Sequence, residues 1–131
     1  MNKVVVAIIS KKNTHGQEEY LLVASKSDFG AFTGFYYPPA GHVEKGEDEV
    51  AALKRELNEE LGLIITSAHK LAETPGDIEN QWTLWYACDV GSFDLRIDSE
   101  EIVDARFVTR AQMTTMNIWP ATKKFFQQYI N

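Results

Sequence analysis

The amino-acid sequence predicts an α/β fold, in which a sheet packs between helices within one domain over residues 1–131. Strand-like segments occur both before and after one amphipathic helix, and a second helix closes the chain. Covering a sheet with helices buries the apolar face of every such element. A length of 131 residues suits one ordinary domain. The content of 44% hydrophobic and 24% charged residues is typical of a folded chain with a core.

The first part of the chain alternates between apolar and polar segments. In order, we expect a buried strand at 4–10, a hairpin loop at 11–19, a second strand at 20–24, a loop at 25–34 and an extended segment at 35–38. The first strand is predicted from its β-branched and apolar residues. The extended segment is predicted because a residue that precedes proline is disfavoured in the helical region.

A helix is predicted over residues 48–61. Val50, Leu53, Leu57 and Leu61 recur at spacings of three, four and four residues, which places them on one helical face. Gly62 follows at the position where glycine commonly ends a helix. The apolar face is expected to pack on the sheet.

The second part of the chain is predicted to complete the sheet and to add the closing helix. In order, we expect a strand at 63–74, a turn at 75–77, a strand at 81–90, a short strand at 101–108 and a helix that begins near Pro120. Proline is favoured in the first turn of a helix. Phe125, Phe126, Tyr129 and Ile130 then share one side of that helix.

Charge and cysteine content exclude some classes of function. The net charge is −6 and the lysines form only short pairs, so we expect no binding to duplex nucleic acid. No apolar run approaches the roughly 20 residues of a membrane-spanning helix, so no membrane partner is expected. Cys88 is a single cysteine, which favours a reducing, cytoplasmic setting. Whether the chain forms a homodimer is left open.

Three glutamates of the predicted helix share one face. With about 100° per residue, Glu56, Glu59 and Glu60 fall within an arc of roughly 100°. Like charges one turn apart destabilise a helix, whereas Mg²⁺ and Mn²⁺ prefer oxygen ligands and would remove the repulsion. A solvated glutamate-rich face is the alternative interpretation of the helix alone.

The segment around this helix matches a longer pattern, G-x5-E-x7-R-E-U-x-E-E-x-G-U, where U is aliphatic. The matching residues are Gly41, Glu47, Arg55, Glu56, Leu57, Glu59, Glu60, Gly62 and Leu63. A chance match in a chain of this length is on the order of one in ten million. The chain therefore resembles the Nudix hydrolases.

Segments on either side of this pattern resemble the same family more weakly. Residues 34–41 resemble its G-x-W-x-x-P-G-G segment, and residues 101–107 resemble its later E-x-x-x-x-R-W segment. Tyr36 and Phe107 stand where the family usually has tryptophan, and Ala40 stands where it has glycine. Alanine keeps the backbone carbonyl but restricts positive φ, so we expect a slightly altered loop.

The resemblance implies an α/β/α sandwich around a mixed sheet and metal-dependent cleavage of a phosphoanhydride. Magnesium or manganese ions would activate water and screen the phosphates. The implied metal ligands are Glu56, Glu59, Glu60 and the Ala40 carbonyl. An extra ligand or base could come from Glu100, Glu101 or Asp104, of which Glu101 is favoured. Glu56, Arg55 and Glu47 are the candidate catalytic residues. Glu47 is expected to organise the loop and the helix by pairing with Arg55.

Candidate substrate-binding residues are Gly41, His42, Tyr36, Trp82 and Trp85. The tryptophans point to opposite faces of a strand, so one could stack on a base while packing explains both equally well. A small-molecule nucleotide is the expected partner, with a (deoxy)nucleoside triphosphate or modified nucleotide favoured. ADP-ribose, a dinucleoside polyphosphate and nucleotide sensing without cleavage are the alternatives. Processing of RNA 5′ ends is disfavoured by the net charge.

Overall fold

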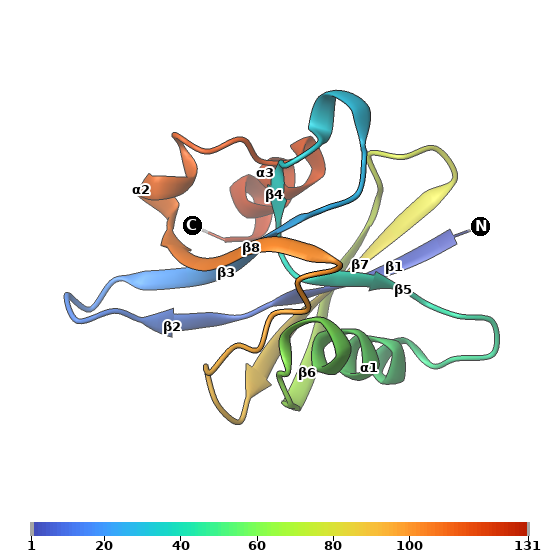
Figure 1. The fold of residues 1–131 in the computed structure, drawn as a ribbon, viewed down its shortest axis with the longest axis horizontal. Helices are drawn as coiled ribbons and strands as arrows, with labels where there is room; N and C mark the ends of the chain where they lie inside the picture. Colours follow the sequence, from blue (N-terminus) through green and yellow to red (C-terminus); the bar gives the residue numbers. More distant parts are fainter. Residues whose placement is uncertain (1, 131) are drawn as a thin grey trace.

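The computed structural model describes residues 2–130, and strands and helices follow one another as an α/β fold requires (Figure 1). The strands are β1 (Asn2–Ile8), β2 (Ser10–Lys12), β3 (Glu18–Ser25), β4 (Tyr36–Tyr37), β5 (Ala40–His42), β6 (Ile65–Pro75), β7 (Gln81–Val90) and β8 (Ile102–Thr109). The helices are α1 (Glu49–Leu61), α2 (Arg110–Met113) and α3 (Pro120–Tyr129), with a 3-10 turn η1 at Gly30–Phe32. The fold class predicted from the sequence is confirmed.

Within residues 2–130 the strands form two sheets. The first has the order β5-β1-β7-β6 and is mixed, because β1 runs parallel to β7 while β5 and β6 are antiparallel to their neighbours. In the second, β3 pairs with β2 and β4 and also with β8, all antiparallel. Only one residue, Ile9, separates β1 from β2, so one extended stretch of chain joins the two sheets.

The residues of β1 alternate between two cores. Val5 and Ala7 face the leucines of α1, whereas Val6 and Ile8 face the phenylalanines of α3. Successive side chains of a strand point to opposite faces, so a continuous apolar strand can be buried on both sides. Helix α1 therefore covers one side of the first sheet and α3 the other, as Figure 1 shows.

Both predicted helices are present, and both begin as their sequences indicate. The Asp48 side chain accepts a hydrogen bond from the Ala51 backbone N–H at 3.2 Å, which caps α1. Gly62 ends α1 with a φ of 67°, a left-handed conformation that favours glycine. Pro120 occupies the first turn of α3. The start of the helix that carries the glutamates is thus set by local capping.

Several shorter elements differ from the sequence-based expectation. The predicted hairpin loop at 11–19 is shorter, because β2 and the start of β3 pair within it. The predicted strand at 63–74 begins at Ile65, and its last residue is Pro75. Strand β5 follows the two prolines and was not predicted, since its pairing with β1 is a tertiary contact. Such short strands carry little periodicity of their own.

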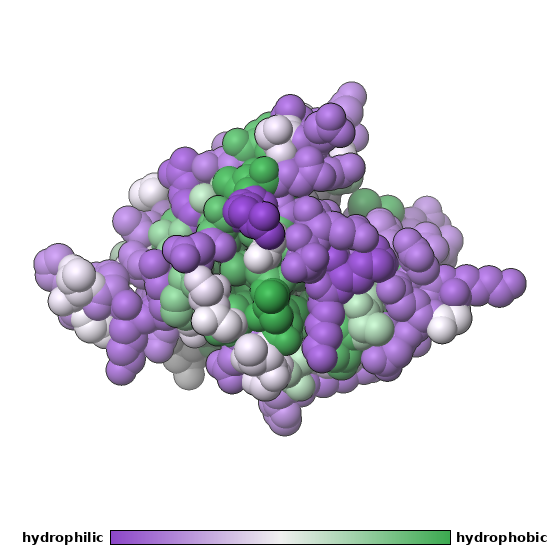
Figure 2. Space-filling view, turned by 60° about the horizontal axis from the view of Figure 1, so that its bottom comes forward, coloured by the Kyte–Doolittle hydropathy of each residue, from purple (hydrophilic) through white to green (hydrophobic). Residues whose placement is uncertain are grey.

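The face drawn in Figure 2 is largely polar, with hydrophobic patches gathered toward its middle. The large apolar side chains with the greatest exposure belong to separate elements and loops, among them Ile64, Val103 and Tyr129. No helix within residues 2–130 is both long and apolar enough to cross a membrane.

Candidate active site

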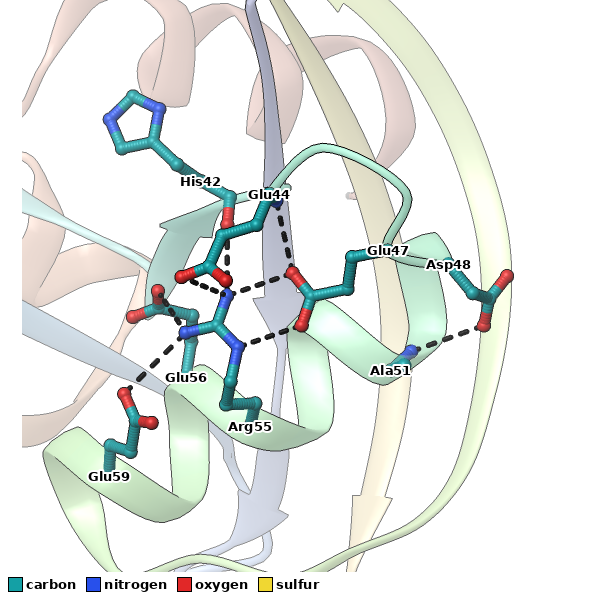
Figure 3. Close-up of polar contacts among 8 residues, drawn as sticks. All are labelled: His42, Glu44, Glu47, Asp48, Ala51, Arg55, Glu56 and Glu59. Carbon is teal, nitrogen blue, oxygen red and sulfur yellow. Dashed lines mark hydrogen bonds and ion pairs between the residues drawn. The ribbon is translucent and has the colours of Figure 1, made fainter.

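Arg55 is the centre of the polar network at the start of α1 (Figure 3). Its guanidinium donates to both carboxylate oxygens of Glu47, with Nε to Oε2 at 2.7 Å and Nη2 to Oε1 at 2.9 Å. Nη2 also donates to the His42 carbonyl at 3.2 Å, and Glu47 accepts the Glu44 backbone N–H at 3.0 Å. The pair thus fastens the loop after β5 to the helix, through a bidentate geometry that is specific to arginine.

The same guanidinium also holds two of the helix glutamates. Nη1 lies 2.9 Å from Glu56 Oε1 and 3.5 Å from Glu59 Oε2. The hydrogen bond from Arg55 keeps the pKa of Glu47 at about 2, below its usual 4.5, and the bond with Glu47 in turn raises the pKa of Arg55. Both groups therefore stay charged at neutral pH.

Glu56 lies directly against the backbone of β5. A Cβ added to Gly41 would lie 2.1 Å from Cγ and 2.7 Å from Cβ of Glu56, which no real contact permits. Glycine at position 41 is therefore required for this close approach. The neighbouring Ala40 belongs to regular β5 pairing with Val6 and has no positive φ, so its own backbone conformation does not require glycine.

Glu60 is half-buried beside other carboxylates. Burial, followed by the charge of Glu56 and a hydrogen bond with it, raises the pKa of Glu60 to about 8. The charges of Glu101 and Glu59 act in the same direction. Tyr37 lies nearby, and burial together with the Glu60 charge raises its pKa to about 12. The carboxylates are held close enough to destabilise one another.

An oxygen-rich cluster of this kind fits a hard divalent cation, which would relieve the repulsion. The side chains are nevertheless not arranged as a finished metal site. No group of three or more His, Cys, Asp or Glu within residues 2–130 is positioned to hold an ion. Two of the three helix glutamates are instead turned toward Arg55. Arg55 contacts only one carboxylate oxygen of each, Oε1 of Glu56 and Oε2 of Glu59, so the other oxygen of each is not held by the arginine.

A cavity of about 550 Å³ extends from these glutamates across the first sheet to the start of α3. Its acidic end is lined by Glu44, Glu56, Glu59, Glu60, Asp98 and Glu101. Its other end is lined by Phe29, Pro38, Asp77, Ile78, Gln81, Trp119 and Ala121. A volume of this size and a mixture of apolar walls with a few polar groups are typical of small-molecule sites.

The cavity brings together most of the candidate residues. Ala40, Gly41, His42, Arg55, Glu56, Glu59, Glu60, Trp85 and Glu101 all line it. Glu47 contacts Arg55 but does not line the cavity. Tyr36 and Trp82 do not line it either. The Tyr36 hydroxyl instead donates to Asp104, so the ring points toward β8.

Trp85 lines the cavity, but its side chain is packed in the core. Its ring stacks on Phe125 with centroids 4.1 Å apart and planes 8° from parallel, and it is 1% exposed. Its Nε1 donates to Thr74 Oγ1 at 2.8 Å. These contacts agree with a packing role for Trp85 rather than with stacking on a base. Cys88 likewise lies in the core beside α1, where burial raises the pKa of its thiol to about 12.

Several lining residues, among them Tyr37, Asp98 and Trp119, were not among the candidate site residues predicted from the sequence. Tyr37 follows the predicted candidate Tyr36, and strand alternation alone determines which ring enters the cavity. Asp98 is placed by a tertiary bond from its backbone N–H to the Glu60 carbonyl at 2.8 Å. Trp119 directly precedes the proline that starts α3. This position is the one feature of the sequence that could have pointed to Trp119 as a site residue.

The fold and the site together define a class of protein: an α/β/α sandwich in which a loop and helix present clustered glutamates to a nucleotide-sized cavity. The model of the NUDIX domain matches residues 1–129, and the chain belongs to this family of hydrolases. Members of the family generally use divalent metal ions.

Relatives and solved structures agree with this assignment. The nucleoside triphosphatase NudI of Enterobacter sp. (strain 638) is 32% identical over 121 residues, which cover 83% of this chain and 86% of that protein. The NAD-capped RNA hydrolase NudC of Haemophilus influenzae is 30% identical over 94 residues, but these cover only 36% of that protein and 72% of this chain.

Two solved structures show the same fold at low sequence identity. The MutT NUDIX hydrolase of Burkholderia pseudomallei has a TM-score of 0.81 at 19% identity, with 98% of this chain and 97% of that one covered. The NUDIX domain of Shewanella oneidensis NrtR, solved with ADP ribose, has a TM-score of 0.80 at 17% identity, with 96% and 84% covered.

Proposed function

We propose that this hydrolase cleaves a phosphoanhydride bond in a nucleoside diphosphate-linked substrate and requires Mg²⁺ or Mn²⁺. A (deoxy)nucleoside triphosphate or a modified nucleotide is the favoured substrate. The cavity of about 550 Å³ has a size typical of small-molecule sites, and the NudI relative, whose match covers 83% of this chain, is named a nucleoside triphosphatase. ADP-ribose and dinucleoside polyphosphates are the alternative substrates.

The charge of the cavity is the observation that carries this proposal. Among the described residues that line it, seven are Asp or Glu, whereas Arg55 is the one lysine or arginine. That arginine already contacts Glu44, Glu47, Glu56 and Glu59. A polyphosphate that entered alone would meet only repulsion at this end, because like charges at close range cost free energy. Divalent cations supply the missing positive charge.

The proposed roles of the residues follow from their positions. Glu56, Glu59 and Glu60 would hold the cation, with the Ala40 carbonyl and Glu101 within the same acidic end. When bound, the cation would acidify a water molecule and neutralise phosphate charge. Glu56 is the proposed acceptor of the proton that the attacking water loses, and Arg55 orients it through the 2.9 Å contact. Glu47 positions Arg55 and does not reach the cavity.

A nucleotide panel tests this proposal. The purified chain is incubated with Mg²⁺ and, separately, with each of the common nucleoside triphosphates, ADP-ribose and a dinucleoside tetraphosphate, and products are resolved by anion-exchange chromatography. We expect release of pyrophosphate or phosphate from at least one triphosphate, and loss of that release in excess EDTA with recovery on adding Mg²⁺. Tight binding without any product would identify a nucleotide sensor. Full turnover in EDTA would contradict the metal requirement.

A further inference from the structure

Trp119, which lines the end of the cavity opposite the glutamates, carries an unpaired hydrogen-bond donor. Nε1 of Trp119 has no exposed surface, and among buried side-chain nitrogen and oxygen atoms of residues 2–130 it alone has no hydrogen-bond partner. A buried donor without a partner is destabilising, because the hydrogen bond that it loses to water is not replaced. Such groups are rare in folded proteins and call for an explanation in each case.

Aromatic side chains surround this donor. The ring of Phe32 stacks on the Trp119 indole at 4.8 Å between centroids, and Phe29 meets it edge-on at 5.3 Å. Phe29 and Trp119 both line the cavity. Flat apolar walls with one polar group are suited to an aromatic heterocycle, because the faces of a base stack and its edge carries acceptors.

An acceptor of fixed position lies at the same end. Asp77 lines the cavity, and both of its carboxylate oxygens accept the Ala121 backbone N–H, at 3.1 and 3.0 Å. Ala121 is two residues after Trp119 in the first turn of α3. Trp119 and Asp77 therefore both line the cavity beside the start of α3.

We propose that Trp119 determines specificity for the nucleobase, with its indole N–H donating a hydrogen bond to an acceptor on the edge of the base. The assignment rests on the proposed nucleotide substrate and adds the residue that recognises its base. Because Nε1 has no exposed surface, a side chain that covers it must move before a base can reach it, and Phe29 and Phe32 are aromatic rings that contact the indole.

The variant Trp119→Phe tests the inference, because it keeps an aromatic ring and removes the N–H. The matched control is Trp82→Phe, which makes the same change at a tryptophan outside the cavity lining. Dissociation constants are measured by calorimetry with Mg²⁺ for the α,β-methylene analogues of the four ribonucleoside triphosphates, and for inorganic tripolyphosphate, which has no base. Because these probes measure binding, the result is independent of whether the chain hydrolyses nucleotides.

We expect Trp119→Phe to weaken binding of the best nucleotide analogue by roughly 3- to 10-fold, the usual worth of one hydrogen bond. Binding of tripolyphosphate should not change, and the melting temperature without ligand should be equal or higher, because no buried donor is left unpaired. Trp82→Phe should leave nucleotide binding unchanged. Unchanged nucleotide binding by Trp119→Phe, an equal loss for tripolyphosphate, or a wild-type protein that binds no analogue would each overturn the assignment.

Discussion

Glu56 and Gly41 are packed so closely that the glutamate side chain occupies the space where any other residue at position 41 would place its Cβ. The distance from that Cβ to Cγ of Glu56 would be 2.1 Å. The glycine of β5 and the glutamate of α1 are therefore one structural unit, although 15 positions separate them in the sequence. The position of the proposed proton acceptor depends on the absence of a side chain from the facing strand.

Gly41→Ala should therefore reduce turnover by displacing Glu56. A misplacement of about 1 Å at a reacting group costs on the order of 10²-fold in rate. The measurement is kcat in saturating Mg²⁺, compared with Gly91→Ala, whose added Cβ would meet only Thr66 Cγ2 at an ordinary 3.8 Å. Equal rates for the two alanine variants would show that Glu56 adapts without loss.

Replacing Glu56 or Glu60 by glutamine should abolish most activity while preserving the fold. Loss of a positioned base typically costs about 10²–10⁴-fold, and weaker cation binding adds to it. In metal-free buffer the melting temperature of Glu60→Gln should be equal or higher, because one of several mutually repelling carboxylates is removed. The exposed Asn58→Ala is the control on the same helix. Near-normal turnover by both glutamine variants would leave the acidic face with no part in catalysis.

The contact between Glu47 and Arg55 should make stability depend on pH at acidic values. The pKa of Glu47 falls from 4.5 to about 2 on folding, so its contribution is fully present above pH 4.5 and is lost as the pH falls toward 2. Thermal melts of wild type and Glu47→Gln should thus differ most at neutral pH and converge between pH 4.5 and 2. The exposed Glu79→Gln serves as control. A gap that stays constant down to pH 2.5 would refute the coupling.

Trp85→Ala should act mainly on stability. Trp85 is 1% exposed and stacked on Phe125, and truncation of such a residue costs about 3–5 kcal/mol of unfolding free energy. Trp82 is only half-buried, so Trp82→Ala should cost clearly less. Urea denaturation gives both values. If Trp85→Ala kept its stability but raised KM for the nucleotide, base stacking rather than packing would be its role.

The parts of the fold that follow from local chemistry were predictable from sequence. The start of α1 at Asp48 and its end at Gly62 are set by capping and left-handed geometry, which individual residues reveal. Strand β5 was missed because three residues between prolines and a loop form a strand only through pairing with β1. The second sheet was likewise not anticipated, since Ile9 gives no local sign that the strand passes from one sheet to the next.

Some residues of the candidate site were likewise predictable from the sequence, and others were revealed only by the structure. The resemblance to the family implied the contact of Arg55 with Glu47, and the motif that carries this resemblance is one contiguous segment. Trp119 could not be assigned, because its importance comes from Phe29 and Phe32, far away in sequence, and from a donor left unpaired. For the same reason the choice between Tyr36 and Tyr37 required the pairing of β4 with β3.

The backbone contacts of Tyr36 connect the aromatic end of the cavity to the strand that leads to its acidic end. Tyr36 N–H donates to the Asn117 carbonyl at 2.8 Å, and Trp119 N–H donates to the Tyr36 carbonyl at 3.1 Å, which ties the aromatic end to β4. Gly41, at the acidic end, is five residues further along the same chain, a span of at most roughly 17 Å. The segment from Tyr36 to Gly41 thus limits the distance between the two ends. A change in its length would alter how many phosphates fit between a base and the glutamates.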